Sequence, residues 1–192
     1  MVSVVPLLTG GEDGQGDDKG GTAAASPSTA GDSPAAPSGS DEPPPGARVV
    51  YEGRTLKLRT PRSRDCVTSA VDFDKGQATT GDETRPDDAE IALQSCISFG
   101  LWVNASAGVS DTPVKTAQQC LEYANQGGLV SIDSYEQLRE ENPIKRGSTL
   151  CLETAEGRIV RAVVQEAQWT RLGEPSVEWA VDYTFKTTLW EQ

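Results

Sequence analysis

The most regular alternation of apolar and polar positions lies near the C-terminus of the chain. Residues 149–154, 158–169 and 177–190 are separated by short glycine-containing turns. In the last of these segments, apolar side chains recur at every second position, which is the period of a strand with one buried face. They are Val177, Trp179, Val181, Tyr183, Phe185 and Leu189. The pattern predicts an antiparallel meander of three strands.

Shorter strands are predicted earlier in the chain, where β-branched and aromatic residues cluster between turn residues. The predicted strands cover residues 48–51, 54–59, 66–73, 89–96 and 99–103, with the first two joined around Glu52-Gly53. Residues 74–88 are polar and contain Gly76, Gly81 and Pro86. This composition predicts a loop.

Two short helices are predicted between these groups of strands. Asp111 or Thr112 is a suitable N-cap for the first helix, with Pro113 in its first turn and Gly127-Gly128 at its end. The apolar positions of this helix fall within an arc of about 120°; they are Val114, Ala117, Cys120, Leu121 and Ala124. Ser134 and Gln137 match a capping box for a second helix that ends before Pro143. The predicted fold class is α+β, mostly antiparallel β-sheet with one or two short helices.

Composition divides the chain into a leader and a domain. Residues 1–46 hold seven of the twelve prolines and nine of the nineteen glycines, together with seven acids and one lysine. A segment of this kind buries too little apolar surface to offset its ordering entropy, so it predicts a disordered acidic leader or tether. Residues 47–192 are predicted to form a single domain. The apolar run from Val2 to Leu8 is expected to be the outer end of a membrane anchor upstream of Met1; the alternative is an apolar N-terminus without function.

The formal net charge of −12 argues against nucleic acid as a partner, because binding it requires a basic stripe. Histidine is absent, which removes the commonest general base and the commonest zinc ligand. The sequence therefore predicts no catalytic residue, no metal site and no cofactor. Paired acids remain the one possible source of catalysis.

Cys66, Cys96, Cys120 and Cys151 contain no C-x-x-C spacing, so a zinc cluster or redox motif is a poor fit. Of the three possible connectivities, the element order favours Cys66 with Cys96 and Cys120 with Cys151. Two such disulfides stapling one small domain predict an oxidising, extracytoplasmic location.

Tryptophans are the best candidates for a binding surface, because an indole ring can contact sugar or peptide faces. Trp179 falls on the apolar face of the last strand and is assigned to the core. Trp102, Trp169 and Trp190 are nominated as binding residues.

Several short strings resemble the outer domains of actinobacterial membrane proteins. The shared strings are a cysteine-bearing strand running into Val71-Asp72-Phe73-Asp74, a helical cysteine within 117–123, Leu150-Cys151-Leu152-Glu153-Thr154, Gly157-Arg158-Ile159-Val160 and Trp190-Glu191. The resemblance covers roughly residues 54–192. It implies a domain tethered through a Pro/Gly/Ser linker to a membrane span, sometimes with a cytoplasmic serine/threonine kinase on the other side, and it implies no activity.

These features favour an extracytoplasmic binding or sensor module that recognises a protein or cell-wall component and is not an enzyme. Two alternatives stay open. One is a secreted hydrolase that uses a carboxylate pair, which predicts two acids converging in one pocket. The other is a purely structural envelope protein.

Overall fold

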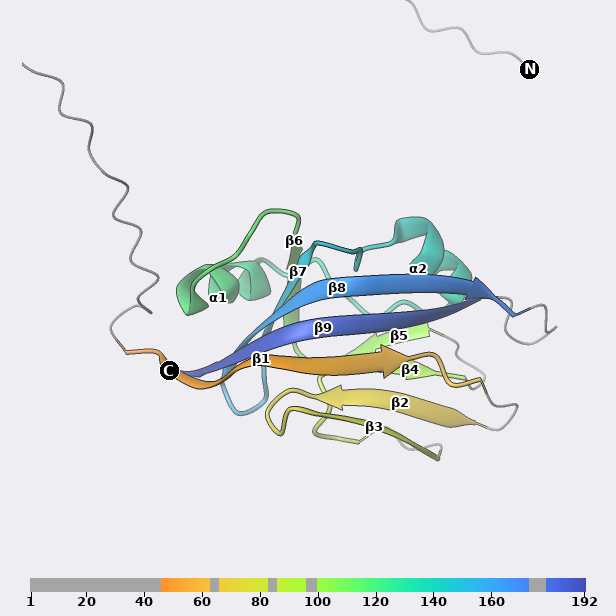
Figure 1. Ribbon diagram of the computed structural model, residues 1–192, viewed down its shortest axis with the longest axis horizontal. Helices are drawn as coiled ribbons and strands as arrows, with labels where there is room; N and C mark the ends of the chain where they lie inside the picture. Colours follow the sequence, from red (N-terminus) through yellow and green to blue (C-terminus); the bar gives the residue numbers. More distant parts are fainter. Residues whose placement is uncertain (1–45, 63–65, 83–85, 96–99, 173–178) are drawn as a thin grey trace, which may run out of the picture. The chain divides into compact units, whose positions relative to one another are not determined.

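The computed structural model describes residues 46–62, 66–82, 86–95, 100–172 and 179–192 (Figure 1). All of them belong to one compact unit, Gly39–Gln192. The predicted leader lies outside the described residues except for Gly46. Among the described residues, no helix is both long and apolar enough to cross a lipid bilayer.

Two antiparallel sheets and two short helices form the unit, in agreement with the predicted α+β class of mostly antiparallel sheet. The larger sheet has five strands in the order β1-β9-β8-β7-β6, and the smaller has four in the order β3-β2-β4-β5. The strands of the larger sheet are β1 (Arg48–Arg59), β6 (Ser106–Ser110), β7 (Thr149–Glu153), β8 (Ile159–Arg171) and β9 (Trp179–Glu191). Those of the smaller sheet are β2 (Val67–Asp72), β3 (Gln77–Asp82), β4 (Ile91–Gln94) and β5 (Gly100–Val103).

The C-terminal meander is confirmed: β7, β8 and β9 pair antiparallel in chain order. Along β9, Val181, Tyr183 and Phe185 are fully buried on one face, as the alternation predicts. The predicted pair of strands around Glu52-Gly53 is wrong. Residues 48–59 form one strand that pairs with β9, and Gly53 adopts a positive φ of 73° at a bulge where the register shifts. A glycine inside a strand can mark a bulge as well as a turn.

The predicted loop at 74–88 contains a strand that the prediction missed. β3 pairs with β2 along its length, at the edge of the smaller sheet. Residues 77–81 are exposed, so polar side chains occupy both faces and the sequence carries no alternation. β6 was also missed; it pairs with β7 at the edge of the larger sheet.

The main core lies between the two sheets. Its buried side chains come from both of them and from the region of α2 (Tyr135–Glu141). Phe73 packs edge-on against Phe185, with ring centroids 6.4 Å apart. Burial of apolar surface between the sheets is the principal stabilising term of the fold.

A second, smaller core lies on the opposite face of the larger sheet, beneath α1 (Ala117–Gln126). Alternation along the strands separates the two cores: Leu150 and Leu152 of β7 face the main core, and Cys151 between them faces α1. Figure 1 shows α1 and α2 at opposite ends of the larger sheet. α1 contacts β6, β7 and β8, whereas α2 contacts β5 and β9.

Both helices are present, but the predicted start of the first is wrong. α1 begins after Thr116 and not at Asp111 or Thr112, because Thr116 and Gln119 form a complete capping box. Pro113 precedes the helix. The end of α1 at Gly127 is confirmed, and so is the second helix, where the Ser134 side chain accepts the Gln137 N–H and Asn142 closes the helix in the left-handed conformation.

The Cys120–Cys151 disulfide is confirmed; it joins α1 to β7 inside the second core, where both cysteines are fully buried. Cys96, the predicted partner of Cys66, lies outside the described residues. The Cys66–Cys96 pairing therefore stays a prediction, and the described part of the chain contains one of the two predicted disulfides.

Candidate functional site

A groove of about 330 Å³ opens on the α1 face of the larger sheet. Its lining comes from β1, β8, β9 and the segment that leads into α1. The lining residues are Val49, Glu52, Lys115, Thr116, Ala117, Arg161, Thr188 and Trp190. The groove thus brings together side chains more than a hundred residues apart in the chain.

Arg161 of β8 makes several contacts within this groove. Its Nη1 donates to the Val114 carbonyl at 3.2 Å, and its Nη2 donates to Thr188 Oγ1 at 3.1 Å. The guanidinium carbon lies 5.5 Å from the centre of the Trp190 ring. The side chain is held by these contacts and, at 22% exposed, remains partly accessible to solvent.

The groove carries more positive than negative charge, although the chain as a whole has a net charge of −12. Arg161 and Lys115 contribute two positive charges. Glu52 contributes one negative charge, with its Oε1 3.9 Å from Arg161 Nη2 and its side chain 68% exposed. The N-terminus of α1, the positive end of the helix dipole, opens on the same side at Ala117.

The structure places the three nominated tryptophans on separate surfaces. Trp190 is 4% exposed and belongs to the second core, so it lines the groove with little accessible surface. Trp102 is partly buried on the smaller sheet and lines a cavity of about 170 Å³. Trp169 is partly buried against the main core, as is Trp179, which Arg139 covers at 4.3 Å from the ring centre. The three nominated tryptophans therefore do not form one binding surface.

The sequence-based interpretation missed the polar residues of the groove. Arg161 occupies a polar position in an alternating strand, where a solvated surface residue is the ordinary expectation. Lys115 lies before a helix whose start was misplaced. Arg161 and Lys115 lie close together because α1 covers this face of the sheet, and the sequence does not show that arrangement.

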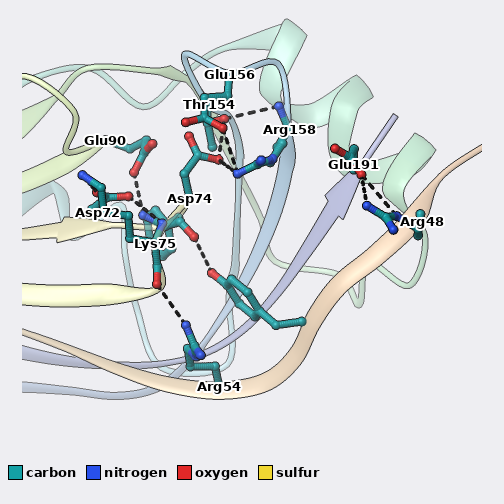
Figure 2. Close-up of polar contacts among 12 residues, drawn as sticks. Arg48, Arg54, Asp72, Asp74, Lys75, Glu90, Thr154, Glu156, Arg158 and Glu191 are labelled. Atoms are coloured by element: carbon teal, nitrogen blue, oxygen red, sulfur yellow. Dashed lines mark hydrogen bonds and ion pairs between the residues drawn. The ribbon is translucent and has the colours of Figure 1, made fainter.

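A second polar cluster joins the β2–β3 turn to neighbouring strands (Figure 2). The Glu90 carboxylate, on a residue 2% exposed, accepts the Phe73 N–H at 2.8 Å. The Tyr51 hydroxyl donates to the Phe73 carbonyl at 2.7 Å. Side chains from β1 and from the residue just before β4 therefore hold the backbone N–H and carbonyl of Phe73.

Two acidic side chains of the same turn, Asp72 and Asp74, form further hydrogen bonds and ion pairs. Asp72 accepts the Lys75 N–H at 2.8 Å and pairs with the Lys75 ammonium, which also contacts Asp88. Asp74 accepts from the Thr154 hydroxyl at 3.0 Å and lies 3.4 Å from Arg158 Nη1. These contacts connect the smaller sheet to the turn between β7 and β8.

Burial perturbs the acids of this cluster. The pKa of Glu90 is raised from 4.5 to about 7, chiefly by burial; the Phe73 N–H bond opposes this shift, and the nearby Asp74 charge adds to it. Burial also raises the pKa of Asp74, while the Thr154 hydrogen bond lowers it. Burial raises the pKa of Tyr51 to about 12.

Glu90 and Asp74 are the two acids that come nearest to the carboxylate pair of the hydrolase hypothesis. Glu90, however, is inaccessible to a substrate, and Asp74 is engaged by Thr154 and Arg158. Neither acid lines the groove at Arg161, the cavity at Trp102 or the groove at Asn142. We assign this cluster a structural role. Within the described ranges, no group of three or more Cys, Asp or Glu side chains is arranged to hold a metal ion.

Comparison of the chain with protein-family models, with curated proteins and with solved structures finds no match. The resemblance to actinobacterial outer domains therefore stays a prediction.

Proposed function

We propose that this protein is an extracytoplasmic binding or sensor module, and that the groove beside α1 is where it recognises a protein or cell-envelope partner. The observation that carries the proposal is the Arg161 guanidinium, which lines the groove, is hydrogen-bonded to two carbonyls and the Thr188 hydroxyl, and belongs to a side chain that is partly exposed to solvent. A fixed charged group in a concave site is typical of ligand recognition.

The walls of the groove support this function because they are held in place before any ligand arrives. The Cys120–Cys151 disulfide ties α1 to β7, and the capping box fixes the first turn of α1. Preorganised walls reduce the entropy lost on binding. The same buried disulfide supports an oxidising location, and the composition of residues 1–46 supports a flexible tether to the membrane.

A groove-filling substitution tests the proposal. Val49 lies at the groove and is 43% exposed, whereas Val130 is 68% exposed and lies between the two helices, away from the groove lining. Val49→Trp and Val130→Trp therefore introduce the same side chain at an exposed valine, one inside and one outside the site. Trp190→Ala is unsuitable because Trp190 belongs to the second core.

The full chain and both variants would be immobilised and exposed to cell-envelope extract. We expect the unmodified chain and Val130→Trp to retain the same component, and Val49→Trp to lose it. Equal retention by all three proteins, or no retention by any, would contradict the proposed groove. Matching thermal midpoints would confirm that both variants fold.

A further inference from the structure

We propose that the group recognised at the floor of the groove is a carboxylate, carried by a short peptide segment with small apolar side chains. This inference rests on the proposed function and names the ligand class for the same site. Three features of the groove support it.

The first feature is the incomplete neutralisation of Arg161. Its described hydrogen-bond acceptors are neutral, two carbonyls and the Thr188 hydroxyl. The acid that pairs with it, Glu52, is 3.9 Å away and mostly exposed, so solvent screens the pair. A carboxylate entering the groove would compensate the guanidinium at hydrogen-bond distance, and charge-assisted bonds of this kind are the stronger ones.

The second feature is the arrangement around Lys115 and the first turn of α1. Gln119 Oε1 accepts the Lys115 and Thr116 N–H groups, and Thr116 Oγ1 accepts the Gln119 N–H. This capping box does not use the Ala117 or Gln118 N–H groups, which belong to the first turn of the helix. The Lys115 ammonium and this turn therefore add positive potential beside Arg161.

The third feature is the composition and size of the remaining lining. Val49, Ala117 and Trp190 provide apolar surface next to the charged groups. A groove of about 330 Å³ accommodates a small ligand and not a folded surface. A peptide carboxylate flanked by small apolar side chains is complementary to both the charged and the apolar residues of the lining.

A matched pair of probes isolates the carboxylate. N-acetyl-alanyl-valine with a free carboxylate and the same compound as its carboxamide differ only in that group. Binding to the full chain would be measured by calorimetry and by amide chemical shifts. We expect the acid to bind at least about tenfold more tightly than the carboxamide, which is what one charge-assisted hydrogen bond contributes, and to shift the amide signals of Ala117 and Thr188.

Variants assign the effect to the groove. Lys115→Gln removes an exposed charge and should weaken binding of the acid about twofold to fivefold. Arg161→Gln should weaken it roughly tenfold or more. Lys57→Gln is the matched control, because Lys57 is exposed on β1 and does not line the groove. If Arg161→Gln does not fold, Lys115→Gln keeps the test decisive.

Equal affinity for the acid and the carboxamide, binding of neither probe, or inorganic phosphate binding as tightly as the acid would each overturn the carboxylate assignment. The proposed function would survive those results if Val49→Trp still lost an envelope component that Val130→Trp retained. Loss of that difference would instead reject the groove itself.

Discussion

Replacing Glu90 by glutamine should make the protein more stable at neutral pH. The carboxylate is 2% exposed, and burial raises its pKa from 4.5 to about 7. Between these two pH values the folded state keeps a proton that the unfolded state has lost. The contribution of Glu90 to the free energy of unfolding is therefore fully present below about pH 4.5 and is lost as the pH rises through about 7.

The size of the effect follows from the same two values. A rise in the pKa of Glu90 from 4.5 in the unfolded state to about 7 in the folded state corresponds to about 3 kcal/mol of free energy of unfolding. Glutamine carries no charge, and its side-chain carbonyl can still accept the Phe73 N–H that Glu90 accepts now. Glu90→Gln should therefore match the unmodified protein near pH 4.5 and exceed it by up to about 3 kcal/mol at pH 8.

Thermal unfolding followed by tryptophan fluorescence from pH 4.5 to 8 measures this difference. For a domain of this size, about 3 kcal/mol corresponds to roughly 6 to 12 °C in midpoint. Glu140→Gln is the control, because Glu140 is an exposed acid on α2 and the substitution removes the same charge. A difference between Glu90→Gln and the unmodified protein that stays constant across the pH range would refute the reasoning.

Three further predictions concern the packing around α1. Gly108→Ala should cost about 3 kcal/mol or more, because its Cβ would lie 2.1 Å from the Tyr123 carbonyl oxygen, whereas Gly81→Ala has open space and should change stability by less than about 0.5 kcal/mol in urea unfolding. Replacing Cys120 and Cys151 together by alanine should cost roughly 3 to 4 kcal/mol, given their separation of 31 residues, and an unchanged urea midpoint would exclude a stabilising disulfide. Thr116→Ala should cost about 1 kcal/mol through the lost N-cap, with Thr116→Ser restoring it.

The strands and helices with strong hydrophobic periodicity could be predicted from the sequence. The buried face of β9 is Val181, Tyr183 and Phe185, as expected; α1 ends at the predicted Gly127, and α2 ends before Pro143. β3 could not be predicted, because its residues 77–81 are exposed and its pairing with β2 comes from tertiary structure. Strands of this kind depend on their neighbours more than on their own composition.

Two ambiguous signals led to errors. Gly53 was interpreted as a turn between two strands, yet in β1 it accommodates a bulge within one strand. Pro113 suited a first helical turn, but the capping box of Thr116 and Gln119 determines where α1 begins. In both cases one local signal fits two structures, and long-range pairing or a competing cap decides between them.

The candidate site was harder to predict than the fold. Glu90 alternates with apolar residues and looked like a solvated strand residue, but Phe73 and the β2–β3 turn bury it. Arg161 looked equally ordinary, because the sequence does not show that α1 covers that side of β8. Trp190, nominated as a binding residue, lines the groove, but its ring is mostly in the core, and its role in binding stays a prediction.

Photo-crosslinking within the envelope tests the central claim most directly. A photoreactive phenylalanine analogue would be placed at Val49, beside the groove, and separately at Val130, outside it, in the full chain. The proposed binding module predicts a discrete crosslinked partner from position 49 that is absent from position 130 and diminished by Arg161→Gln. A discrete partner from position 130 alone, or no partner from either position, would contradict the assignment of the groove as the binding site.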